Sequence, residues 1–226
     1  MTGKMRKRMG KSAGILVAIM AIGILGTGPA FAQETPGDCL SADEANLAQL
    51  LNDYRAANDL DPIPVTASLT AVAQWHVWDL DVNDPYGGDC NLHSWSDGEL
   101  WTPVCYTADH ANASGMWDKP REITGNAYGG NGFEIAYWSS GTATPAGALS
   151  GWQNSSGHND VILNNGIWNS YDPWPAMGIG MRGGYAVVWF GGITDPQGTV
   201  VECGTEDTAQ VAWGSIKALY RASGSK

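Results

Sequence analysis

Basic residues are scarce in this chain of 226 residues, which has 12 Lys and Arg against 23 Asp and Glu. Five of the basic residues lie within the first 11 positions, so a chain without them changes its formal net charge from −11 to −16. Binding to nucleic acid or to anionic lipid depends on clustered Lys and Arg. The composition therefore argues against a nucleic-acid partner, and we interpret the acidic surface as a means of staying soluble.

Long apolar runs are also lacking, apart from one near the start. Residues 15–24 follow the five basic residues, and this run is shorter than the roughly 20 residues that a spanning helix needs. Ala30-Phe31-Ala32 supplies the small residues that a signal peptidase reads, so we predict a signal peptide over residues 1–32 and cleavage before Gln33. An uncleaved anchor is the alternative. We expect an exported chain without a membrane span, either secreted or periplasmic.

Several motifs of catalysis and metal binding are missing. The chain has no C-x-x-C, no G-x-S-x-G and no H-E-x-x-H, which argues against a zinc ribbon, a serine hydrolase elbow and a zincin helix. The glycines of residues 178–183 match a dinucleotide fingerprint but lead into a strand, so we assign them to a turn and to close packing. Residues 79–83 begin like a calcium loop, but Asp84 and Cys90 occupy its glycine and glutamate positions. We favour a solvated helix end.

The pattern of apolar and turn residues predicts several regular elements. Residues 83–124 show no persistent period, and a loop of this length is usually functional or disordered. Gly157 is expected to end a short helix, leaving His158 at the break. The predicted elements are helices over 41–58, 68–81, 145–153 and 205–222, and a hairpin of segments 176–181 and 185–190.

Two ionisable side chains lie in apolar surroundings. His76 falls on the apolar face of the second helix, where we expect a hydrogen-bonded core histidine rather than a ligand. Glu134 lies inside the run Phe-Glu-Ile-Ala-Tyr-Trp of residues 133–138. A buried carboxylate must find a partner, so Glu134 either has one or points to water from an edge position.

The order of several short motifs resembles a known family. Trp152-x-x-Ser155-Ser156-Gly157-His158 is preceded by His93-Ser94 and Glu134 and followed by Gly178-Ile179-Gly180. This order is similar to that of the bacterial branch of the CAP superfamily, which includes cysteine-rich secretory proteins, antigen 5 and pathogenesis-related proteins. The resemblance implies an α+β fold, a three-layer α-β-α sandwich over residues 41–192. A short segment, 33–40, precedes this domain, and an extension, 193–226, follows it.

Four cysteines lie in the predicted exported part, and an even number in an oxidising compartment favours disulfides with three alternative pairings. Cys90 and Cys105 bracket the long loop, and Cys39 and Cys203 lie just outside the ends of the CAP-like region. We therefore expect Cys90 to pair with Cys105 and Cys39 with Cys203.

The resemblance also implies a site in which histidines and acids gather and can hold a divalent metal. Carried over by motif, its residues are His93, Glu134 and His158, and these are the candidate catalytic and metal-binding residues. Ser156 and Trp152 join them as candidate ligand-binding residues. Two imidazoles and a carboxylate would suit zinc with an open position for water. The same residues could instead form a metal-free hydrogen-bond network.

Three functions remain open from the sequence. The leading one is an extracellular binding module, expected as a monomer, for a small molecule, lipid or peptide. The second is a metal-assisted hydrolase that uses the same residues. The third is a cell-wall or glycan interaction protein, which would require Trp95, Trp101 and Trp117 to lie exposed on one face.

Overall fold

The computed structural model describes residues 36–204 of the chain. The predicted signal peptide and the helix predicted over 205–222 lie outside the described residues. The elements are, in chain order, α1 (Ala42–Ala56), α2 (Ala67–Val82), α3 (Ala113–Trp117), α4 (Lys119–Ile123), β1 (Gly132–Trp138), α5 (Pro145–Gln153), α6 (Ser156–Ile162), the 3₁₀ helix η1 (Gly166–Tyr171), β2 (Ala176–Arg182) and β3 (Tyr185–Gly191).

Three antiparallel strands form a sheet in the order β1-β3-β2. The hairpin predicted between the last two strands is present, and it turns at Gly183, whose φ of 54° suits glycine. All seven residues of the central strand β3 are buried, and five consecutive residues of β1 and of β2 are buried as well. The sheet therefore has both faces covered.

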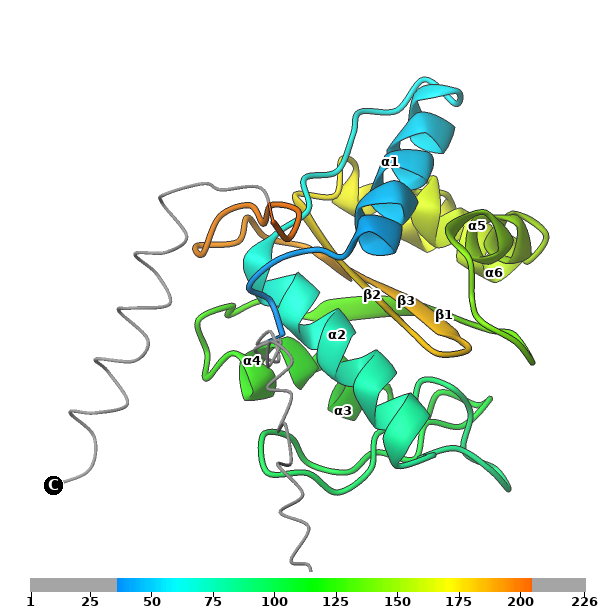
Figure 1. The fold of residues 1–226 in the computed structure, drawn as a ribbon, viewed down its shortest axis with the longest axis vertical. Coiled ribbons are helices and arrows are strands. Elements are labelled where there is room, and N and C mark those ends of the chain that lie inside the picture. Colours follow the sequence, from blue (N-terminus) through cyan, green and yellow to red (C-terminus); the bar gives the residue numbers. More distant parts are fainter. Residues whose placement is uncertain (1–35, 205–226) are drawn as a thin grey trace, which may run out of the picture. The chain divides into compact units, whose positions relative to one another are not determined.

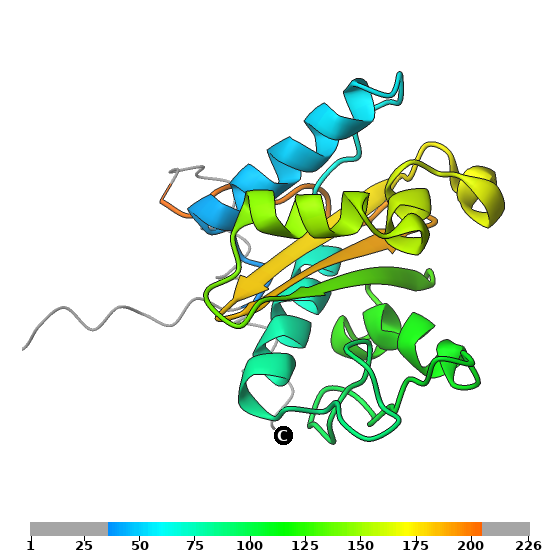
Figure 2. The same cartoon turned by 90° about the vertical axis from the view of Figure 1, so that its right-hand side faces the viewer.

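Helices cover the two faces as separate layers (Figures 1 and 2). On one face, α1, α5 and α6 pack over side chains such as Ile135, Ile179 and Val188. On the other face, α2 and the loop that carries α3 and α4 pack over Val187 and Trp189. This arrangement is the predicted α-β-α sandwich.

Two glycines of β2 let α2 approach the sheet closely. A Cβ atom added to Gly178 would lie 1.9 Å from the carbonyl carbon of Leu69, and one added to Gly180 would lie 2.3 Å from the carbonyl oxygen of Ala73. Real Cβ atoms do not come this near to backbone, so only glycine fits at either position without a shift of the helix. The prediction that these glycines serve close packing is confirmed.

The starts of the two long helices, α1 and α2, are capped by side chains that accept hydrogen bonds from backbone N–H groups. Ser41 and Glu44 form the predicted capping box of α1. At α2 the residue before the helix, Thr66, makes no such bond, and the carboxylate of the distant Asp195 accepts one from the backbone N–H of Ser68 at 2.8 Å. Sequence patterns miss a cap of this kind because the acceptor is 127 residues away.

The expectation that residues 83–124 lack regular structure was wrong in part, because α3 and α4 lie within this stretch. Each helix has only five residues, which is too short for a periodic pattern to be visible. The rest is ordered by a bridge between Trp95 and Val104 and by the disulfide from Cys90 to Cys105.

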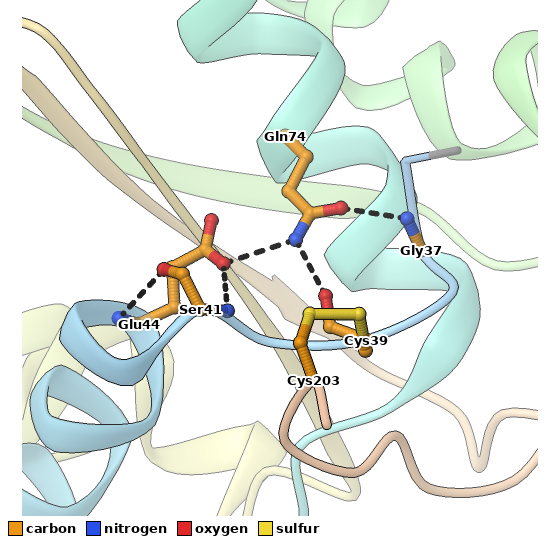
Figure 3. The surroundings of a disulfide bond; sticks show 6 residues. All are labelled: Gly37, Cys39, Ser41, Glu44, Gln74 and Cys203. Carbon is orange, nitrogen blue, oxygen red and sulfur yellow. Dashed lines mark hydrogen bonds between the residues drawn. A yellow bond between two sulfur atoms is a disulfide. The ribbon is translucent and has the colours of Figure 1, made fainter. Parts of the chain in front are cut away.

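The second disulfide joins Cys39 to Cys203, so both pairs expected from the sequence are present. Around it, Gln74 of α2 donates to the backbone carbonyl of Cys39 and to the carboxylate of Glu44 (Figure 3). Glu44 also accepts a hydrogen bond from the backbone N–H of Met181 in β2. This network ties the first residues of the domain to α1, α2 and the sheet.

Candidate functional site

Glu134 occupies the third position of β1, opposite Trp189 of the central strand. Its side chain is fully buried, so Glu134 does not point to water from an edge position, which was one of the two alternatives left by the sequence. Alternation along the strand turns Glu134 toward the α2 layer, as it does Ala136. The buried carboxylate does find partners, and they are histidines.

His93 is the first of these partners. Its Nδ1 atom forms a short hydrogen bond with Oε2 of Glu134. The loop holds His93 in place through the side chain of Asn91, which accepts the His93 backbone N–H, and the ring of Tyr106 packs edge-on against the imidazole at 5.3 Å. Because Nδ1 is hydrogen-bonded to the carboxylate of Glu134, the other ring nitrogen of His93, Nε2, is available to a ligand.

His158 reaches the same place from the opposite layer. Its ring centroid lies 6.4 Å from that of His93, and the side chain is half-buried. The sequence predicted that Gly157 ends a helix and that His158 follows this end, which was wrong. Helix α5 ends at Gln153 and α6 begins at Ser156, so the break lies about three residues before Gly157. His158 therefore lies in the first turn of α6.

His76 was expected to be a hydrogen-bonded core histidine, and it is fully buried on α2 with Nε2 3.2 Å from the carbonyl oxygen of Ser94. It also lies against the site, because its Nδ1 is 3.6 Å from Oε1 of Glu134. Its ring stacks on Trp95 at 4.3 Å. The one signal in the sequence was an ionisable residue on an apolar face, and its proximity to Glu134 depends on the tertiary structure.

The environment pushes the histidine pKa values in different directions. Burial acts to lower the pKa of His93, but the charge of Glu134 and the hydrogen bond to it outweigh burial and raise that pKa above its usual value. Burial lowers the pKa of His158, and the neighbouring His93 lowers it further. Burial also lowers the pKa of His76. The surface of the site thus pairs a histidine that favours its cationic form with one that favours its neutral form.

Tyr106 and His110 extend the site away from Glu134, and no motif pointed to Tyr106. The Tyr106 hydroxyl lies 2.8 Å from Nδ1 of His110, an exposed residue that the sequence gave no reason to include. Burial raises the pKa of Tyr106, and the charge of Glu134 adds to the effect. Tyr106 directly follows Cys105, so the disulfide to Cys90 holds both it and His93 in the same loop.

The two remaining ligand-binding candidates differ in exposure. Ser156 is exposed at the start of α6, two residues before His158, and can contact a ligand. Trp152 is only 1% exposed, and its indole N–H donates to the backbone carbonyl of Ala136 at 3.0 Å. A ligand-binding role for Trp152 therefore does not fit, because its ring is part of the core and its polar atom is used.

Within residues 36–204, no three or more His, Cys, Asp and Glu side chains are placed to hold a metal ion together. His93, Glu134 and His158 lie close to one another, but the carboxylate of Glu134 faces Nδ1 of His93. A carboxylate behind a histidine is the usual arrangement that orients a metal-binding imidazole. The residues present thus fit a pair of histidine ligands with Glu134 behind one of them, and not the expected three-ligand set.

The structure also places two other features that the sequence offered for binding, the three tryptophans and the calcium-like stretch. Trp95 and Trp101 are buried and Trp117 is half-buried against Phe133, so these three do not form the exposed face that glycan binding required. The Asp79 carboxylate, at the start of the calcium-like stretch, is buried and accepts hydrogen bonds from Ser96 and Asn83. Among residues 36–204, no helix is long and apolar enough to cross a membrane.

Comparison with known proteins gives the family and remote structural neighbours. The family model described as CAP, cysteine-rich secretory protein family, matches residues 48–168. No curated protein matches the chain significantly.

Among solved structures, an extracellular protein containing an SCP domain from Bacillus anthracis is 18% identical, over 66% of this chain and 39% of that one, with a TM-score of 0.45. A cysteine-rich secretory protein from Staphylococcus aureus is 14% identical over 72% and 40% of the two chains, with a TM-score of 0.43. The outer surface protein from Borrelia burgdorferi is 15% identical over 66% and 91%, with a TM-score of 0.44. The match thus spans about two fifths of the length of the first two proteins. The family model covers more than half of the chain, and the chain belongs to the cysteine-rich secretory protein (CAP) family.

Proposed function

We propose that this CAP protein is exported and acts as a binding module, with its ligand site at His93 and His158. The observation that carries the proposal is the meeting of two half-buried imidazoles from opposite layers over a buried carboxylate. His93 in its cationic form donates through Nε2, and neutral His158 can accept a hydrogen bond. Such a pair suits a ligand with a carbonyl or carboxylate oxygen beside a donor group, as small molecules, peptides and lipid headgroups have.

The experiment follows the histidine ring signals by NMR while three probes are added to a chain that begins at Gln33. The probes are N-acetyl-dialanine for peptides, palmitate for lipids and chitotriose for glycans. We expect one of the three probes to shift the ring signals of His93 and His158. The double variant His93→Ala/His158→Ala should no longer bind that probe. His110→Ala is the matched control, because it removes an exposed imidazole that reaches the site only through Tyr106. Binding that the double variant retains would place the ligand elsewhere and refute the proposal.

The second candidate is a metal-assisted hydrolase, favoured by the hydrogen bond that Nδ1 of His93 donates to the carboxylate of Glu134. Zinc would be held by His93 Nε2 and by His158, and Glu134 would orient the His93 ring through Nδ1. A bound zinc ion lowers the pKa of its water and polarises a carbonyl group. In this candidate, the chain holds the His93 imidazole in a fixed orientation. The His158 imidazole has no hydrogen bond among the described residues.

A zinc titration by calorimetry tests this candidate, with His93→Ala/His158→Ala beside the native chain and circular dichroism to verify folding. Micromolar binding that the double variant loses would support the metal site and justify a hydrolase screen with and without a chelator. If the native chain does not bind zinc, the hydrolase is refuted and the binding module stands alone. Exposed tryptophans, the observation that would have favoured glycan binding, are not found at the three predicted positions.

A further inference from the structure

The free edge of the sheet lies at the histidine site. Among the described strands β1 pairs only with β3, so its other side forms an edge of the sheet. In Figure 2, β1 runs between α5 and the loop that carries α3 and α4. His93 comes from this loop and His158 from α6, yet their rings lie 6.4 Å apart. Side chains from opposite layers come this close only beyond the edge of β1, because elsewhere the sheet separates them.

The pattern of strand pairing shows which backbone groups of β1 point to this edge. In an antiparallel pair, successive residues alternate between bonding the neighbouring strand and pointing away from it. Met177 of β2 bonds residues 64–66 on its outer side, so the next residue, Gly178, bonds Trp189 of β3. Trp189 thus directs its N–H and C=O groups to β2 and not to its other register partner, Glu134. The backbone N–H and C=O groups of Glu134 therefore point to the free edge.

The backbone is also the part of Glu134 that solvent reaches. The residue is 7% exposed although its side chain is fully buried, so the accessible surface belongs to the backbone. Ala136, two residues further on, points its carbonyl to the same edge, where the indole N–H of Trp152 donates to it. No group of residues 36–204 bonds the backbone N–H or C=O of Glu134 in this way. One donor and one acceptor of the edge are thus open beside the two imidazoles.

Two half-buried tryptophans lie next to the preceding residue of β1. Trp117 of α3 and Trp168 of η1 come from opposite sides of the sheet, and their ring centroids lie 6.0 and 5.1 Å from that of Phe133. Each side of the edge therefore supplies one imidazole near Glu134 and one indole near Phe133. Polar and apolar surface follow one another along this edge.

We propose that the ligand of this site is an extended peptide segment that pairs with the edge of β1 at Glu134. The inference rests on the binding function proposed above and narrows its ligand to one class. One peptide residue donates its N–H to the carbonyl of Glu134 and accepts the N–H of Glu134 through its own carbonyl, as in strand addition. An apolar side chain of the peptide lies against Trp117 and Trp168.

The other ligand classes do not match this pair of backbone groups. Palmitate has no N–H donor. The acetamido group of a glycan has both groups, but they belong to one trans amide and point in opposite directions. An extended amino-acid residue presents its N–H and C=O on the same side, at the spacing that Glu134 itself has.

Backbone amide NMR of the chain that begins at Gln33 tests the pairing, with N-acetyl-alanyl-leucyl-alanine amide as the probe. Bound peptide should shift the amide signal of Glu134 and slow its hydrogen exchange by about tenfold or more, because a new hydrogen bond protects it. The amide of Ile135 bonds β3 already and should change little. Analogues N-methylated at each residue in turn lack one donor, and at least one should bind about tenfold more weakly, because the carbonyl of Glu134 loses its partner.

A pair of chain variants tests the apolar contact. Trp117→Ala should weaken binding of the leucine peptide by about tenfold, because a half-buried indole is removed from beside the edge. Trp138→Ala is the matched control, since it removes an exposed indole at the other end of β1, beyond the carbonyl that Trp152 occupies. Equal affinity of the two variants would refute this placement of the peptide.

The outcomes separate this inference from the function proposed above. Edge pairing is overturned if the peptide shifts the ring signals of His93 and His158 but not the amide of Glu134, or if every N-methylated analogue binds as tightly as the parent. Ring shifts caused by palmitate or chitotriose, with none caused by the peptide, overturn it too. In each of these cases the binding site at the histidines stands. If no probe shifts the ring signals, both the binding site and the edge pairing fail.

Discussion

At the scale of single residues, the site depends on one carboxylate inside the fold. Glu134 touches His93 through one oxygen and faces His76 with the other, so both sides of the carboxylate meet an imidazole. His93 and His158 are the parts that a ligand can reach. The family motif indicated these residues in advance, but the role of His76 could not be predicted, because residues 76 and 134 meet only after α2 packs on the sheet.

The first prediction concerns the pH dependence of the pair of His93 and Glu134. The folded protein raises the pKa of His93 above the usual value of about 6.5. The pair therefore stabilises the fold fully below about pH 6.5, and this contribution is lost as pH rises through the raised pKa. Urea unfolding from pH 5 to 9 should show His93→Gln destabilised at the acid end, with the difference from the native chain shrinking toward alkaline pH. His110→Gln is the control, and a difference that stays constant with pH would contradict the prediction.

At the scale of elements, α2 is the helix that organises the site. It carries His76, packs against the backbone of β2, and receives its cap from a loop far along the chain. The limits of α2 were predicted within one residue at each end, because its apolar residues recur at helical spacing. The contact partners of α2 were not predictable, since a helix that is apolar on most sides does not reveal which side meets the sheet.

The second prediction tests how closely α2 approaches the sheet. Gly178→Ala would put a Cβ 1.9 Å from the backbone of Leu69, so the helix must move away from β2. We expect a loss of roughly 3 kcal/mol or more in the free energy of unfolding, at the upper end of what overpacking usually costs. Gly129→Ala is the control, because its Cβ would meet no atom within 4 Å. Equal stability of the two variants in chemical denaturation would show that the packing is looser than described.

The third prediction tests the remote cap of α2. Asp195→Ala leaves the buried backbone N–H and hydroxyl of Ser68 without their acceptor. Loss of a cap costs about 1–2 kcal/mol, and burial places this one at the upper end. Thr144→Ala, which removes the exposed cap of α5, should cost less. Thermal unfolding of both variants checks the order, and a larger loss for Thr144→Ala would count against a structural role for Asp195.

At the scale of the whole molecule, the two disulfides act over very different lengths of chain. Cys39 and Cys203 are separated by 164 residues and enclose nearly all of the described domain. Cys90 and Cys105 are separated by 15 residues and close the loop that carries His93. One crosslink therefore constrains the unfolded domain as a whole, and the other constrains one side of the site.

The fourth prediction follows from these lengths. On loop-closure entropy, Cys39→Ser/Cys203→Ser should lower the free energy of unfolding by about 5 kcal/mol and Cys90→Ser/Cys105→Ser by about 3 kcal/mol. The second variant should also broaden or shift the NMR signals of the His93 ring, whereas the first should leave them in place while the protein is folded. Denaturant unfolding and histidine NMR check both points. An unaffected His93 in the second variant would show that the disulfide does not position it.

The sequence by itself determined the local elements and the family. Each depends on signals carried by neighbouring residues or by the order of motifs: the capping box of α1, the proline and threonine that open α5, and the glycine turn of the last hairpin. Tertiary structure alone decided how the candidate side chains are placed and which others lie beside them. Glu134 is buried rather than exposed, Trp152 belongs to the core, and His76 lies beside Glu134. The physical reason is that these residues lie on separate elements, whose side chains meet only when the helix layers close over the two faces of the sheet.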